Sequence, residues 1–192
     1  MRRFTVSLSL AFVVLLGFVT SGMSPRAQEA TPSAMSTHPI VGTWLMILTG
    51  TGGAFAETFG PDGSDVVGFP ATESGNPIAG ADGVTYLGPG VGVWEPTGPY
   101  SVAFTVIQAL SDADGTPLGS LTIDAYLELS EDGQTAVDDW TLGTTLTYRD
   151  TAQNVVNSFA VPSEFPPLVG TRMRVGAAGF PEGTPTAGTP AP

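Results

Sequence analysis

Hydrophobic and polar residues alternate with a period of two along most of the chain between residues 39 and 175. No segment in this range repeats apolar residues at the spacing of an amphipathic helix. Because successive side chains of a strand point to opposite faces of a sheet, the pattern predicts β-strands. We predict eight of them, over residues 41–49, 54–59, 65–69, 91–95, 100–110, 118–130, 135–148 and 168–175.

The connections between these segments favour hairpins. Asp-Gly pairs recur at 62–63, 82–83, 114–115 and 132–133, and Asp-Gly between alternating runs is typical of tight turns because glycine tolerates a positive φ. Consecutive hairpins form a meander, and eight meandering strands close on themselves to remove their edges. The predicted fold class is therefore all-β, an eight-stranded antiparallel up-and-down barrel.

The alternation also predicts which side chains face the barrel interior. The expected inward positions of the fifth, sixth and seventh strands are Val102, Phe104, Val106, Leu121, Ile123, Ala125, Leu127, Leu129, Trp140, Leu142 and Leu146. An eight-stranded barrel has an interior that is either filled by side chains or open enough for one small ligand. The sequence leaves both outcomes open.

Two short motifs at the ends of the barrel segment resemble those of the lipocalin-like (calycin) barrels. Gly42-Thr43-Trp44 lies on the first predicted strand, and Gly170-Thr171-Arg172 lies on the last. In that superfamily a Gly-x-Trp motif places the indole across one end of the barrel, and an arginine from the last strand stacks on it. The resemblance implies that Gly42, Trp44 and Arg172 close the barrel structurally. The lipocalin disulfides and terminal helix are missing, so the chain is more similar to compact bacterial secreted barrels, including the allene oxide cyclase type.

The regions outside the barrel have compositions of their own. Residues 1–27 combine Arg2 and Arg3 with an apolar run over 6–19, which is the layout of a secretory signal peptide. The run is shorter than the roughly 20 residues of a spanning helix, so we expect a secreted, extracellular protein of a bacterium without stable membrane insertion. Residues 28–38 are predicted to be a flexible tether, and 39–175 the barrel domain. The Pro-, Thr-, Gly- and Ala-rich residues 176–192 are predicted to be a disordered tail.

The charge of the chain excludes one class of partner. The formal net charge is −12, with six arginines, no lysine and 18 acidic residues. All acidic residues lie beyond residue 27, so removal of that segment with its three arginines leaves 3 − 18 = −15. Such a field repels nucleic acid, whose binding needs a basic surface. The negative charge is explained by the need to keep an exported protein in solution, and attraction of a cationic partner is the alternative explanation.

Several kinds of catalytic and metal site are excluded by the absent residue types. The chain has no cysteine and no lysine, and its single histidine, His38, lies in the predicted tether. Cysteine nucleophiles, Schiff bases, histidine-bearing triads and the usual zinc sites are thereby removed. We predict no catalytic residues, no metal and no cofactor. Asp138, on the face of Trp140, is either a carboxyl at the solvated rim or an interior acid with a raised pKa.

The leading functional hypothesis is a non-catalytic barrel that binds a small hydrophobic ligand between Phe104, Ile123, Trp140 and Tyr148. Two alternatives remain open: a cofactor-free isomerase or cyclase of the allene-oxide-cyclase type, and a filled barrel that acts as an exported structural or interaction module. Residues 70–89 form a long predicted loop, either a lid over the barrel or a solvated excursion.

Overall fold

The computed structural model describes residues 32–80 and 83–174. Its elements are one short helix and twelve strands: α1 (Pro32–Thr37), β1 (Gly42–Leu48), β2 (Gly53–Phe59), β3 (Ser64–Gly68), β4 (Thr72–Ser74), β5 (Val84–Leu87), β6 (Gly90–Gly98), β7 (Ser101–Ser111), β8 (Pro117–Leu129), β9 (Thr135–Asp138), β10 (Thr145–Asp150), β11 (Val155–Ala160) and β12 (Leu168–Arg172). The predicted signal peptide 1–27 and tail 176–192 lie outside the described residues.

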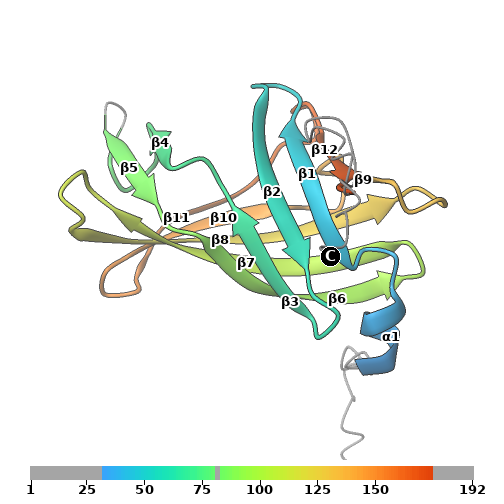
Figure 1. Cartoon of the computed structure of the whole chain (residues 1–192). Helices are drawn as coiled ribbons and strands as arrows, with labels where there is room; N and C mark the ends of the chain where they lie inside the picture. The colour runs from blue at the N-terminus through green and yellow to red at the C-terminus, as the bar shows by residue number, and fades with distance from the viewer. Residues whose placement is uncertain (1–31, 81–82, 175–192) are drawn as a thin grey trace, which may run out of the picture.

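Eight of the strands form a closed antiparallel ring, as predicted. The order around the ring is β1-β2-β3-β6-β7-β8-β9-β12, and β12 pairs again with β1. The ring strands follow one another in chain order, so the barrel is an up-and-down meander. Figure 1 shows β1 and β2 crossing in front of the long strands β7 and β8. The all-β, eight-stranded barrel fold is confirmed.

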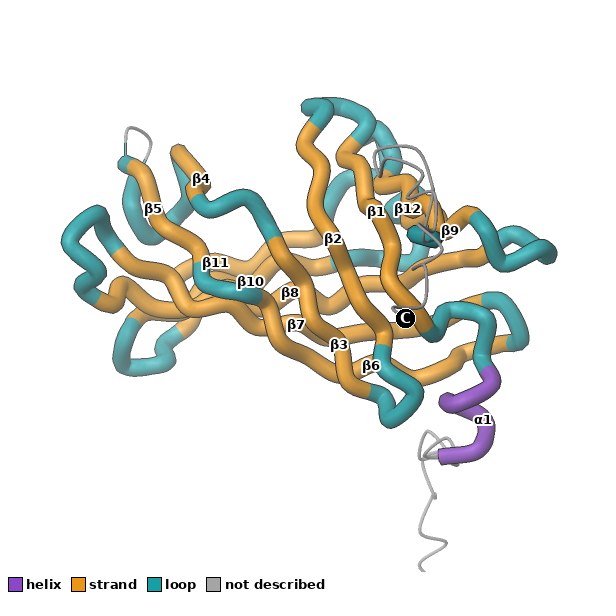
Figure 2. Tube along the Cα trace, in the orientation of Figure 1, coloured by secondary structure: helices purple, strands orange, loops and turns teal. Residues whose placement is uncertain are grey.

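The other four strands form an extension beyond the ring, which consists of β4, β5, β10, β11 and the ends of β7 and β8 with which they pair. The hairpin β4–β5 is attached to the last residues of β7, and the hairpin β10–β11 is attached to the first half of β8. In Figure 2 these strands lie on the left, beside the distal ends of β7 and β8. Residues 70–89, predicted as a loop, therefore contain a hairpin paired with the rest of the sheet.

The prediction of one continuous strand over residues 135–148 is wrong, because this segment forms two separate strands. Residues 135–138 belong to the barrel as β9, whereas β10 begins at Thr145 and pairs with a different part of β8. The break follows from Trp140, which has a φ of 66° and so cannot continue a strand. Leu142 is 53% exposed, which corrects its predicted inward position. Leu146 is half-buried and lies in the extension.

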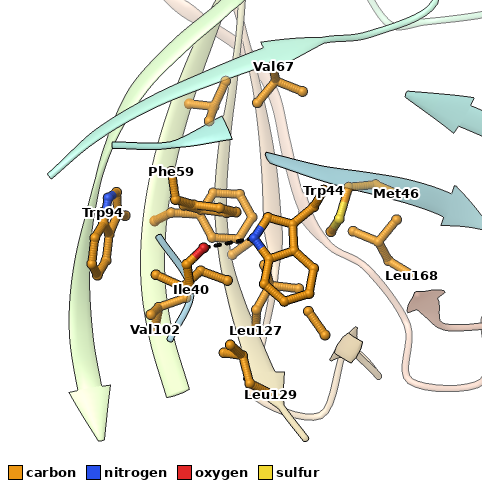
Figure 3. Close-up of a cluster of buried hydrophobic side chains, with 14 of the residues drawn as sticks. Ile40, Trp44, Met46, Phe59, Val67, Trp94, Val102, Leu127, Leu129 and Leu168 are labelled. Carbon is orange, nitrogen blue, oxygen red and sulfur yellow. Dashed lines mark hydrogen bonds between the residues drawn. The ribbon is translucent and has the colours of Figure 1, made fainter. Parts of the chain in front are cut away.

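One end of the barrel is packed solid. Trp44, Phe59, Val102 and Leu127 are at most 1% exposed, and Figure 3 shows them with other apolar side chains around the Trp44 indole. The predicted inward residues Val102, Phe104, Val106, Leu121, Ala125, Leu127 and Leu129 are all buried. A second, smaller cluster around Leu110, Leu121 and Tyr148 forms the core of the extension.

Residues 32–37 of the segment predicted as a flexible tether form helix α1, and residues 28–31 lie outside the described residues. Met35 of α1 packs against the main core, and His38 is buried. The His38 Nε2–H donates to the Gly98 carbonyl at 3.0 Å, and the Ile40 N–H donates to Nδ1 at 3.2 Å. Burial lowers the pKa of His38. Within residues 32–80 and 83–174, no helix has the length and apolar character needed to cross a membrane.

Candidate functional site

A cavity of about 440 Å³ occupies the other end of the barrel and continues into the extension. The inner end of the cavity, here called its floor, is formed by inward-facing residues of the barrel strands: Phe55, Glu57 and Phe104. The next inward residue of β2, Phe59, does not line the cavity and lies in the packed core. The volume lies in the range of small-molecule sites, which are mostly apolar pockets with a few polar groups. The barrel is thus filled at one end and hollow at the other.

The four side chains predicted to contact a ligand all line this cavity. Phe104 lies inside the ring, and Ile123 lies on β8 where the barrel joins the extension. Trp140 lies in the connection between β9 and β10, and its Nε1–H donates to the Pro166 carbonyl at 3.0 Å. Tyr148 lies on β10, outside the ring, which corrects its predicted place in the barrel interior. Their role in binding stays a prediction.

The cavity reaches the surface beside aromatic side chains. Phe159 on the edge strand β11 and Phe165 in the loop before β12 both line it, and they are 41% and 57% exposed. The β1–β2 turn contributes Gly50 and Thr51 to the same rim. An apolar molecule can therefore approach the cavity without crossing the packed end of the barrel.

Two carboxyl groups are buried on neighbouring strands of the barrel, and one of them, Glu57, lines the cavity. Glu57 of β2 and Asp65 of β3 are 2% and 1% exposed, and both point inward. The Glu57 Oε2 and both Asp65 oxygens lack a hydrogen-bond partner. Two ionised carboxylates have no proton to share, so these groups bond to each other only when one is protonated.

The same burial controls the ionisation of this pair. Desolvation raises the pKa of Asp65 to about 7, although the proximity of the Glu57 side chain and of the Val66 backbone opposes the shift. Desolvation also raises the pKa of Glu57 well above its ordinary value, and the charge of Asp65 and a hydrogen bond with it act in the same direction. The pair therefore holds at least one proton at neutral pH.

Asp138 is an interior carboxyl and not a rim group. It is 3% exposed and lines the cavity, its Oδ1 accepts from the Trp140 N–H at 2.8 Å, and its Oδ2 accepts from the Thr144 hydroxyl at 2.5 Å. Burial raises its pKa, and the hydrogen bonds from Thr144 and Trp140 oppose this effect. Asp138 thus holds the Trp140 turn in place as well as facing the cavity.

A fourth carboxyl, Glu73, connects the two hairpins of the extension. The Tyr148 hydroxyl donates to Glu73 Oε1 at 2.9 Å, and the Asn76 amide donates to Glu73 Oε2 at 3.0 Å. Burial, followed by the charge of Glu73, raises the pKa of the Tyr148 hydroxyl far above its usual value, so that it remains a donor. Tyr148 on β10 therefore fastens the β4–β5 hairpin across the cavity.

Tyr148→Phe should loosen this hairpin. The substitution removes one hydrogen bond to a charged group, typically worth about 1.5–3 kcal/mol, and leaves the ring in place. We expect faster amide hydrogen exchange in β4 and β5, with little change in β1 and β2. Thr147→Val, which removes the hydroxyl contact of Thr147 with Ser158 on the exposed side of β10, is the control. Equal protection of the hairpin in both variants would contradict the role of Tyr148.

The opposite end of the barrel is closed by an indole and a guanidinium. Trp44 and Arg172 are paired in register on β1 and β12, and the Arg172 Cζ lies 4.5 Å from the centroid of the indole. The Trp44 Nε1–H donates to the Ile40 carbonyl at 2.7 Å, as Figure 3 shows. Gly42 has a φ of 135°, and a Cβ there would lie 2.8 Å from Arg172 Nη1. The glycine of the motif is thus required by both backbone conformation and space.

The chain matches no protein-family model, and it has no significant match among curated proteins or solved structures.

Sequence reasoning missed two kinds of polar group in the cavity. Glu57 shares the inward face of β2 with Phe55 and Phe59, so the alternation of residues 54–59 was sufficient to find it. Glu73 had no such signal, because its place depends on a hairpin that packs against a strand about 75 residues later. Among the described residues, no group of three or more His, Cys, Asp or Glu side chains is arranged to hold a metal ion.

Proposed function

We propose that the chain is a secreted, lipocalin-like barrel that binds a small apolar molecule in this cavity. The observation that carries the proposal is the hollow half of the barrel, with a volume of about 440 Å³ and walls formed mainly by aliphatic and aromatic side chains. An interior open to that extent contrasts with the tight packing around Trp44. The acidic, cysteine-free composition and the N-terminal layout of a signal peptide support an extracellular site of action.

Tryptophan fluorescence provides a direct test. Of the three tryptophans, Trp140 lines the cavity, while Trp44 and Trp94 lie in the packed core. The neutral apolar dye N-phenyl-1-naphthylamine should bind with 1:1 stoichiometry and quench the Trp140 emission. Trp140→Phe should abolish the quenching but not the dye's own fluorescence increase, and Trp94→Phe should preserve both.

A second variant tests the location of the bound dye. Ile123→Asp places a charge in the middle of the lining, and we expect at least a tenfold loss of affinity, because burial of an unpaired carboxylate costs more than about 1.4 kcal/mol. Ile107→Asp, at a 44% exposed position on the outer face of β7, is the matched control. Dye binding that survives in Ile123→Asp, or the absence of saturable binding in the unmodified protein, would refute the proposal.

An isomerase or cyclase is the second candidate, and one observation favours it. The cavity is lined by two carboxyl groups, Glu57 and Asp138, whose pKa burial raises above the ordinary value, and buried carboxyls of this kind serve as acids or bases in catalysis. Mass spectrometry of the ligand recovered after incubation separates the two functions. A binding protein returns the ligand with its original retention time and fragmentation, whereas an isomerase returns a rearranged molecule of the same mass.

A further inference from the structure

A short segment outside the strands crosses from the extension to the ring at the cavity. Residues 161–167, here called the strap, connect β11 with β12. Four residues of the strap line the cavity: Val161, Pro162, Phe165 and Pro166. Residues 162–166 are nevertheless all exposed and belong to no strand. The strap is therefore a piece of the cavity wall that has solvent on its other side.

The sequence makes the strap stiff along its length. Pro162, Pro166 and Pro167 all lie within it, and a proline ring fixes φ and restricts the residue before it. In its middle, the Phe165 N–H donates to the Pro162 carbonyl at 3.0 Å and closes a turn. Such a segment moves as a unit about its ends more readily than it changes its own shape.

The end of the strap is fastened by two contacts, here called the latch. The Pro166 carbonyl accepts from the Trp140 indole N–H at 3.0 Å. The Pro167 carbonyl accepts from the Thr49 N–H at 3.3 Å and from the Thr49 hydroxyl at 2.7 Å. The Pro166 ring also lies against the β1–β2 turn, where a Cβ on Gly50 would be only 2.9 Å from its Cγ. The latch thus joins the strap to two different parts of the barrel.

The start of the strap continues the sheet and forms a natural pivot. The Val161 N–H donates to the Thr144 carbonyl at 2.8 Å, directly after the last paired residue of β11. The β4–β5 hairpin on the other side of the cavity is held more firmly, because it pairs with β7 and buries Asn76 and Thr85. Segments with few buried contacts open at the lowest free energy, so the strap is the part of the wall that opens most easily.

We propose that the strap is the gate of the cavity: it pivots at Val161, releases Trp140 and Thr49, and opens the wall beside the β1–β2 turn to let a ligand enter and leave. This inference rests on the proposed function and adds the control of access to it. The closed strap is the state in which the cavity wall is complete. Opening therefore sets the association and dissociation rates together and leaves the affinity unchanged.

A disulfide that locks the strap tests the gate. The chain has no cysteine, so Gly50→Cys/Pro166→Cys contains a single possible pair. A Cβ on Gly50 would lie 3.2 Å from the Pro166 Cβ, within a few tenths of an ångström of the roughly 3.5–4.5 Å that a disulfide spans. Gly50 has no positive φ that would strain a cysteine.

The rate of dye uptake by the locked protein is the measurement. In stopped-flow mixing, the oxidised variant should take up N-phenyl-1-naphthylamine at least about tenfold more slowly than the same protein after reduction, because association slows when the required opening is blocked. Gly50→Cys alone, treated in the same way, is the control, and reduction should not change its rate.

Thr49→Val loosens the latch without a crosslink. Thr49 does not line the cavity, and valine keeps its shape while removing the hydroxyl that donates to Pro167. We expect the association and dissociation rates of the dye to rise together by about two- to tenfold, as the loss of one hydrogen bond implies, with an unchanged Kd. Thr43→Val, which removes a hydroxyl contact with Thr58 on the outer face of β1, is the control.

The possible failures are distinguishable. If the oxidised variant takes up the dye as rapidly as its reduced form, or if Thr49→Val changes neither rate, the gate is refuted and the proposed binding function stands. Faster uptake in Tyr148→Phe together with rapid uptake by the locked protein would assign entry to the β4–β5 hairpin instead. If the unmodified protein shows no saturable binding of the dye, the gate and the binding function are both refuted.

Discussion

Folding stability should fall by on the order of 4 kcal/mol, from Asp65 alone, as the pH rises from about 4 to about 8. The folded barrel raises the pKa of Asp65 from 3.8 to about 7. Between these values the folded protein binds more protons than the unfolded chain, so each step up in pH favours unfolding. Glu57, whose pKa burial also raises well above its ordinary value, acts in the same direction.

Other groups contribute in the same pH range, and a reference variant removes their effect. Burial lowers the pKa of His38 from 6.5, which destabilises the fold as the pH falls. The double variant Glu57→Gln/Asp65→Asn keeps His38 but removes both buried titrations. Denaturant unfolding at constant ionic strength should give a much steeper loss of stability with rising pH in the unmodified protein than in this variant.

A charge-matched control separates the buried pair from the net charge of the molecule. Glu95→Gln/Glu128→Gln removes two carboxyl groups from exposed positions of β6 and β8. This variant should retain the pH dependence of the unmodified protein. If the double variant at Glu57 and Asp65 shows that same dependence, the two carboxyls are not the source of it.

Trp44→Ala should destabilise the barrel by about 3–5 kcal/mol, the usual cost of truncating a fully buried aromatic residue. Trp44 is fully buried in the main core, and its indole N–H donates to the Ile40 carbonyl. Such a loss is a large fraction of the stability of a typical domain. Denaturant midpoints with unchanged slopes are the measurement.

Arg172→Ala should cost less, and its effect should depend on Trp44. The guanidinium stacks on the indole and also donates to the carbonyls of Pro39, Val41 and Gly133. A double-mutant cycle should give a coupling of about 1–2 kcal/mol, as expected for a partly desolvated cation–π contact. Arg149→Ala, which loses one hydrogen bond to the Gln153 carbonyl, should show no coupling to Trp44. Additive effects at Trp44 and Arg172 would mean that the stacking contributes nothing.

The sequence was most informative where side chains alternate between two environments. The ring strands were predictable because inward residues such as Val102, Phe104 and Leu127 repeat at every second position. The break after Asp138 was not, because the chain turns at Trp140, a left-handed residue that is not a glycine, three residues before Gly143. β11 was missed because all six of its residues are exposed, so it has no alternation of buried and exposed positions.

The candidate site divides in the same way. Phe104 and Ile123 were found from the faces of long strands, and Glu57 was present in the same kind of pattern. The Glu73–Tyr148 contact joins two hairpins of the extension that are distant in the chain, and nothing local encodes it. The alternation of the sequence therefore predicted the apolar residues that line the cavity. The hydrogen bond between Glu73 and Tyr148 could be found only from the three-dimensional structure.

Eight strands of the sheet close into a ring, whereas the extension leaves two strands, β4 and β11, with an unpaired edge. Part of the cavity wall thus belongs to the closed ring, and part belongs to two hairpins whose outer strands, β4 and β11, are paired on one side only. Hairpins attached in this manner separate at a lower free energy than the whole domain. The hairpins of the extension can therefore open while the closed ring stays intact, so access to the cavity and the stability of the whole domain depend on different parts of the chain.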